Sequence, residues 1–216
     1  MNPDGKKSKL EVGVDVPWVT SWSEEREQGV GVCPTVGDRL AILQDDRAGY
    51  GKPQYSMNHF VRQRASVGRM LCPMCGQPTA EGDRWTQVAS RTTARRLRAV
   101  RRFPLPAQIP DHQIIIDAGA IAPLHLACVH RSLEHCPHLR SNPKVEVMAF
   151  PARWVAFPLY VEGVPDPGPR LVLANPGPAP RPIPIISFLQ LCGVTDEIDA
   201  KRRGRLARGP RTQSPF

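Results

Sequence analysis

The chain has 216 residues, a formal net charge of +9 and a sequence pI of about 9.7. Apolar residues make up 41% of it and aromatic residues only 6%, so a hydrophobic core can form but is small. The start of the chain is polar and no run of about 18 apolar residues occurs, which predicts neither a signal peptide nor a membrane span. We therefore expect a cytoplasmic protein, in which the six cysteines are metal ligands or free thiols rather than disulfides.

The composition changes along the chain and predicts three regions. Residues 1–30 are polar and Gly-rich and are predicted to be a flexible N-terminal arm. Residues 31–194 are predicted to form one α+β domain, whose zinc-binding core spans 71–140. Residues 195–216 are rich in charge and are predicted to be a basic disordered tail. Because 24 prolines and 17 glycines are present, we expect long loops and only a few short strands and helices.

Four short elements are predicted between the arm and the middle of the domain. A basic helix over 58–69 leads into the first cysteine pair, and alternating polarity predicts a strand over 84–90. A strongly basic helix over 92–102 ends at the prolines that follow it. A strand over 113–116 then leads into a turn over 117–119.

A third helix is predicted over 123–135, with a proline in its first turn and an apolar stripe along one side. Pro137 ends this helix. Beyond it we expect a strand over 145–160 that is broken by its prolines, another strand over 171–174, and a short closing helix or strand over 185–192.

The segment Cys72-Pro-Met-Cys75-Gly76 has the composition of a zinc knuckle. Two thiolates two residues apart can bind one ion only if the turn between them is tight. Gly76 tolerates the positive φ that such a turn requires. A CxxC pair can also be a redox centre, but that arrangement belongs at the start of a helix in a βαβ unit, whereas this pair precedes a polar turn.

The second half of the site is predicted at His125 and Cys128, in the first turn of the helix over 123–135. Positions i and i+3 lie on one helix face, so both side chains can meet the knuckle. Three Cys and one His form a closed tetrahedral site, which is typical of structural zinc. The spacing predicts a treble-clef zinc finger, with the residues between the two pairs containing an insertion that carries the basic helix.

Other potential ligands follow on the same helix and beyond it: His130, His135, Cys136 and His138. Cys136 lies eight residues after Cys128, about 12 Å along a straight helix, so it cannot complete the same site. We interpret Cys136 as a small buried apolar residue. The isolated Cys33 and Cys192 are predicted to be core residues.

The motifs LCPMCGQP, APLHLAC and CPHL together resemble a group of uncharacterised small proteins from actinobacteria and their phages. The matching positions are Leu71 to Gly76, Pro123 to Cys128 and Cys136 to Leu139, and the likeness covers about residues 60–195. The resemblance implies zinc binding and no established activity. This chain departs from the group's pattern at His125, where the group usually has Cys.

Basic residues suggest nucleic acid as one class of partner, because arginine clusters neutralise phosphates without reading bases. One cluster surrounds the predicted basic helix: Arg91, Arg95, Arg96, Arg98, Arg101 and Arg102. A second lies in the tail: Lys201, Arg202, Arg203, Arg205 and Arg208. The alternative interpretation is a solvated helix face and a solubilising tail.

Two further functions remain open. A nuclease of the HNH type would use His112 as a base and Asp111 as a metal contact, although no Asn or second metal-binding His stands at the family's spacing. A protein-interaction or assembly factor of a phage or mobile element would suit the Pro-rich segment 176–184. The motifs of other common enzymes are absent from the sequence, so binding is favoured over catalysis.

Overall fold

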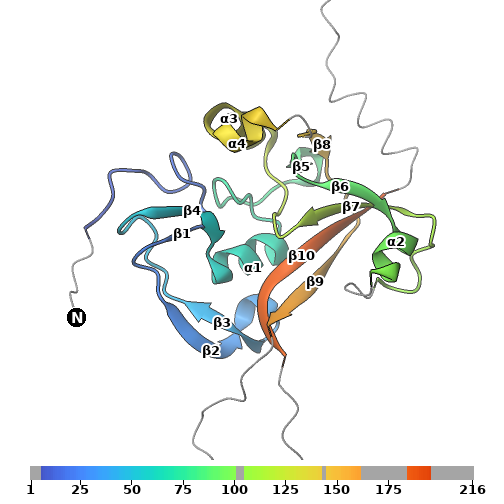
Figure 1. Ribbon diagram of the computed structural model, residues 1–216, viewed down its shortest axis with the longest axis horizontal. Helices are drawn as coiled ribbons and strands as arrows, with labels where there is room; N and C mark the ends of the chain where they lie inside the picture. Colours follow the sequence, from blue (N-terminus) through green and yellow to red (C-terminus); the bar gives the residue numbers. More distant parts are fainter. Residues whose placement is uncertain (1–5, 101–104, 143–144, 162–183, 196–216) are drawn as a thin grey trace, which may run out of the picture.

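The protein is described by a computed structural model that covers residues 6–100, 105–142, 145–161 and 184–195. These residues form a mixed α+β fold, in which helices and loops surround a central sheet (Figure 1). The α+β class predicted from the sequence is therefore confirmed. The strand predicted over 171–174 lies outside the described residues, and so does nearly all of the Pro-rich segment and of the basic tail.

The central sheet has six strands. Their order is β2 (Glu27–Cys33), β3 (Arg39–Gln44), β10 (Ile185–Thr195), β7 (Ile114–Gly119) and β6 (Ser90–Thr93), and β9 (Trp154–Val161) also pairs with β10. β10 runs parallel to β3 and antiparallel to β7 and β9. The end of the described chain therefore joins elements from its beginning and its middle.

β10 settles the alternative between a closing helix and a closing strand. Nine of its eleven residues are buried, and a strand covered on both faces has such a nearly continuous apolar run. Pro158 was expected to break the strand in which it lies. It does not, because it is part of β9 and pairs in register with Leu189. Proline lacks an N–H, but β9 pairs only with β10 among the described strands, and such an edge position tolerates proline.

Helix α1 (Phe60–Arg69) lies against β10 and β3 and confirms the helix predicted before the first cysteine pair. The ring of His59 caps its first turn by accepting the N–H of Arg62, and Met70 ends it in the left-handed conformation with φ of 51°. The sequence predicts only that this helix is basic. Two of its arginines, Arg62 and Arg64, are buried, with exposed fractions of 4% and 0%.

The N-terminal region differs from the predicted flexible arm over its described residues. β1 (Thr20–Trp22) pairs with β4 (Pro53–Asn58), and β2 forms an edge of the central sheet. Trp22 is fully buried, and Glu25 accepts two hydrogen bonds of 2.6 and 2.7 Å from Arg62. Charge pairing between distant segments orders this region, and no local pattern in the sequence reveals it.

The elements between the two cysteine pairs differ in their bounds from those predicted, and β7 (Ile114–Gly119) is longer than the strand expected over 113–116. β5 (Trp85–Thr86), which pairs with β8 (Met148–Ala149), and β6 replace the single strand expected over 84–90. The basic helix is α2 (Ala94–Ala99), because Thr92 and Thr93 belong to β6 and Thr93 caps the helix. The turn expected over 117–119 is the end of β7.

The remaining helices are α3 (Leu126–His135) and α4 (Pro137–Ser141), with single 3-10 turns η1 (Pro34–Val36) and η2 (Glu81–Asp83). Pro137 ends α3 as predicted, but it also begins α4. In the part of the chain that the structure describes, no helix combines the length and apolarity needed to cross a membrane.

Candidate metal centre

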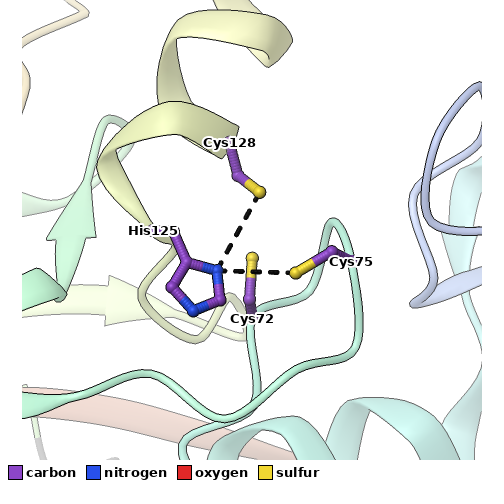
Figure 2. Close-up of side chains that lie close together, drawn as sticks. All are labelled: Cys72, Cys75, His125 and Cys128. Carbon is purple, nitrogen blue, oxygen red and sulfur yellow. Dashed lines mark hydrogen bonds between the residues drawn. The ribbon is translucent and has the colours of Figure 1, made fainter.

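The four predicted ligands lie close together, with their sulfur and nitrogen atoms facing one another (Figure 2). Cys72 and Cys75 belong to the turn after α1, and His125 and Cys128 lie at the start of α3. One ligand atom from each residue lies within 4.8 Å of the other three. Two pairs that are about 50 residues apart in the sequence therefore form one cluster that could hold a metal ion.

Backbone hydrogen bonds shape the CxxC turn. The N–H of Gly76 donates to the carbonyl oxygen of Cys72 at 2.8 Å, and the N–H of Cys72 donates to the carbonyl oxygen of Gln77 at 2.8 Å. Gly76 has φ of +76°, which favours glycine. The tight turn predicted from the sequence is present, and it directs both sulfurs to the same side (Figure 2).

His125 lies one residue before α3, not within its first turn as expected. It is the N-cap residue, with φ of −62° and ψ of 149°. Its Nε2 lies 3.1 Å from the carbonyl oxygen of Pro78. An Nε2–H that donates to this carbonyl leaves the lone pair of Nδ1 facing the sulfurs, and such outer hydrogen bonds commonly orient metal-binding histidines. Asp83 provides the cap that His125 does not, because its carboxylate accepts the N–H of Leu126 at 2.8 Å.

The distances in the cluster fit a tetrahedral ion. Nδ1 of His125 lies 3.4 Å from Sγ of Cys75 and 4.0 Å from Sγ of Cys128. With bonds of about 2.3 Å to sulfur and about 2.0 Å to nitrogen, a tetrahedral ion separates these atoms by about 3.5 Å. The two measured distances lie on either side of this value. A small ion can therefore contact all four ligands with little movement of the side chains.

The electrostatics of the cluster also favour a cation. Burial, followed by the neighbouring Cys72 and Cys75, raises the pKa of Cys128 to about 12. Burial likewise raises the pKa of Cys72, although the backbone N–H groups around its sulfur act in the opposite direction. A bound cation offsets both burial and mutual repulsion and stabilises the thiolate form.

Arg131 is a part of the site that sequence reasoning missed. One of its Nη atoms donates to Sγ of Cys128 at 3.6 Å and to the carbonyl oxygen of Gly13 at 3.0 Å. Three thiolates and a divalent cation carry a net charge of −1, which the guanidinium offsets. The sequence offers one signal for this contact, because Arg131 follows Cys128 by three residues and so lies on the same helix face. Such a spacing is too common among basic residues to single out Arg131.

The N-terminal region covers the outer side of the CxxC turn. The N–H of Trp18 donates to the carbonyl oxygen of Met74 at 2.8 Å, and the N–H of Val19 donates to that of Pro73 at 3.0 Å. A Cβ added to Gly76 would lie 2.9 Å from the indole of Trp18, so the indole lies directly on this glycine. Residues 13–19 therefore form a strap, which we call the N-terminal strap, across the metal centre.

The competing ligands are not in the cluster. His130 is exposed. Cys136 lies at the junction between α3 and α4 and is half-buried, not fully buried as predicted. Cys33 and Cys192 are buried in two other apolar clusters, as predicted. A second group of potential ligands, Glu25, Asp46 and His59, meets the guanidinium of Arg62, which already forms ion pairs with both carboxylates.

The arginines predicted to bind nucleic acid differ in exposure and in their ion pairs. Arg95 and Arg96 are exposed on α2. Arg91 pairs with Glu146 at 3.1 Å, and Arg98 pairs with Asp111. Arg101 and Arg102 lie outside the described residues, as does the basic cluster of the tail.

The pair predicted for an HNH nuclease is adjacent to α2. Asp111 forms its ion pair with Arg98, whose guanidinium also donates to the carbonyl oxygen of Pro106 at 2.9 Å. Asp111 is therefore engaged by a cation of the protein itself. His112 is exposed and lies in none of the metal-binding groups found among the described residues.

Comparison of this chain with protein-family models, with curated proteins and with solved structures yields no significant match. The resemblance to the actinobacterial and phage group, which the sequence motifs suggest, therefore stays a prediction. The metal centre rests on its own geometry.

Proposed function

We propose that Cys72, Cys75, His125 and Cys128 hold one structural Zn²⁺ and that the chain is a zinc-stabilised binding protein. The observation that carries the proposal is the approach of three sulfurs and one imidazole nitrogen to within 4.8 Å of one another. Thiolate and imidazole ligands in a tetrahedral arrangement suit zinc and not the hard ions magnesium and calcium. All four ligands come from the protein, which leaves no open position for a catalytic water.

The local topology supports a treble-clef-like core. A CxxC turn supplies two ligands, and the start of a helix supplies the other two. The residues between the pairs contain α2 together with β6 and β7, two strands of the central sheet. The insertion predicted from the spacing would thus join the metal core to the rest of the domain.

Zinc content tests the first part of this function. Elemental analysis of the purified full chain is expected to find one zinc per chain, and the Cys75→Ser variant is expected to lose it. Cys136→Ser serves as the matched control and should keep one zinc. Absence of zinc from the wild-type protein, together with no uptake of added zinc, would overturn the proposal.

For a partner we propose nucleic acid, bound through the exposed face of α2. Arg95 and Arg96 support this, since both are exposed and no ion pair holds either of them among the described residues. Arg91 and Arg98 have acidic partners, so they contribute less net charge. Such a surface would bind phosphates without selecting a sequence.

Binding to a short DNA duplex at several salt concentrations tests the partner. The affinity should fall steeply with salt, and the double variant Arg95→Gln, Arg96→Gln should reduce the slope of log K against log salt by about 2. Arg26→Gln, Arg69→Gln removes the same charge from exposed positions outside α2 and should change the slope less. Zinc-loaded protein that does not bind DNA would exclude nucleic acid and favour a protein partner, and the zinc result would stand independently.

A further inference from the structure

Cys33 lies against a buried guanidinium, far from the metal centre in the sequence. It ends β2 and is 1% exposed, and Arg64 of α1 is 0% exposed. Sγ of Cys33 lies 3.6 Å from Nη2 of Arg64 and 3.0 Å from Oγ1 of Thr35. A cation and a hydroxyl thus approach the same sulfur.

Arg64 has no carboxylate partner among the described residues. Its other hydrogen bonds go to the carbonyl oxygens of Ser187 at 2.7 Å and Ile42 at 2.6 Å, and its Nε has no partner in the described structure. A guanidinium remains charged in proteins, and a buried charge is costly unless an opposite charge offsets it. Of the groups to which Arg64 donates in the described part of the chain, Cys33 alone can become an anion.

The environment of Cys33 contrasts with that of Cys192 in the same sheet. Burial raises the pKa of Cys33, but hydrogen bonds from Thr35 and the nearby charge of Arg64 outweigh it, so that the pKa lies below the ordinary value. For Cys192, burial and the carboxylate of Asp117 act together and raise the pKa to about 12. One buried cysteine is therefore adjacent to a cation and the other to an anion.

We propose that Cys33 is held as a thiolate by Arg64 and is a site of oxidation by small hydroperoxides. The thiolate sulfur attacks one peroxide oxygen, and the S–O bond forms as the O–O bond breaks. The sulfur loses two electrons, the peroxide gains them, and the second oxygen leaves as hydroxide from hydrogen peroxide or as alkoxide from an alkyl hydroperoxide. The product is a sulfenic acid at Cys33, which thiols can reduce. Thr35 and Arg64 can donate hydrogen bonds to the leaving oxygen.

The location of Cys33 allows such a reaction. The residues on either side of Cys33 are at the surface, since Val32 is 60% exposed and Pro34 is exposed. The short turn η1 follows Cys33 directly. Opening of this turn brings the sulfur to solvent. Hydrogen peroxide is little larger than water and needs only a small opening.

The ionisation of Cys33 can be measured without access to the sulfur. The zinc-loaded wild-type chain and the Cys33→Ser variant are compared by ultraviolet thiolate absorbance at neutral pH. The wild type is expected to exceed the variant by one thiolate. Equal absorbance would overturn the proposal.

Reactivity is measured on the wild-type chain, so that the result does not depend on folding of a variant. After treatment with hydrogen peroxide and a sulfenic-acid trap, mass spectrometry should find the label on the Cys33 peptide and not on the Cys192 peptide. Alkylation of Cys33 by iodoacetamide should rise less than the about 80-fold expected for an ordinary thiol between about pH 6 and pH 8. Equal labelling of the two peptides, or the full 80-fold rise, would overturn the proposal.

Thr35→Val separates a positioned thiolate from one that is merely buried. The substitution preserves the side-chain shape and removes the hydroxyl that contacts Sγ. Peroxide oxidation of Cys33 should become slower, while the zinc content stays unchanged. An unchanged oxidation rate would exclude a role for Thr35 in holding the thiolate.

Discussion

Replacement of Cys128 by serine is the perturbation that tests the metal centre most directly. The apolar cluster around the site is small, and its buried apolar side chains other than cysteines are Met74, Leu124 and Val129. Burial of such a side chain stabilises by about 1.5–3 kcal/mol, so the three provide about 5–9 kcal/mol. A structural zinc contributes about 10–16 kcal/mol at neutral pH. The ion is therefore expected to dominate the stability of this part of the fold.

The loss can be bounded from below. Loss of an outer-shell partner of a metal site typically costs 10- to 100-fold in affinity, and loss of a ligand itself should exceed that. Cys128→Ser should therefore weaken zinc binding by more than 100-fold, or about 2.7 kcal/mol. Competition with a chromophoric chelator measures the affinity. Cys136→Ser makes the same chemical change about 12 Å farther along α3 and should leave the affinity unchanged.

Hydrogen exchange locates the consequence in the chain. The central sheet has its own buried clusters around β10, so metal loss should release the CxxC turn, the start of α3 and the N-terminal strap before the sheet opens. Protection should fall in these three segments in Cys128→Ser. If the affinity for zinc and the protection of these segments equal those of Cys136→Ser, the reasoning that places Cys128 in the metal centre is refuted.

Three further predictions follow from individual contacts. Arg131→Met should weaken zinc binding about 10- to 100-fold, because its guanidinium donates to a ligand sulfur, whereas Arg140→Met on exposed α4 should not. Gly76→Ala should lower the free energy of unfolding in urea by more than the about 1–2 kcal/mol expected at Gly37, since both glycines have positive φ but only Gly76 faces an indole. His59→Asn keeps a side-chain oxygen that can cap α1. In this variant the free energy of unfolding should decrease less than in the wild type as the pH falls below about 6.5.

The sign of the pH effect follows from burial. Burial, followed by the charge of Arg62, lowers the pKa of His59 in the folded chain. The unfolded chain therefore takes up the proton first, so the stability present above about pH 6.5 is lost as the pH falls. The measurement is the pH dependence of urea unfolding in wild type and His59→Asn. Parallel pH profiles of the two proteins would contradict the prediction for His59. Equal zinc affinity of Arg131→Met and Arg140→Met would contradict the prediction for Arg131. An equal loss in the free energy of unfolding for alanine at Gly76 and at Gly37 would contradict the prediction for Gly76.

The sequence by itself determined the features that depend on local chemistry. The CxxC turn could be predicted because two thiols, a proline and a glycine at this spacing favour one tight geometry. Most of α3 follows from its apolar stripe and from the prolines at its two ends. The α+β class follows from the alternation of such elements.

Only the tertiary structure decided the features that depend on contacts between distant residues. Trp22 and Glu25 looked like part of a flexible arm until Arg62 and β4 provided partners for them. Arg131 and the N-terminal strap belong to the metal centre through contacts that span more than 50 residues. The composition gives Arg64 only as one of many basic residues, which usually lie at the surface. In the structure it lies fully buried beside Cys33. The physical reason is the same in each case: the cost of burying a polar group depends on its partner in space, and the sequence does not state which partner that is.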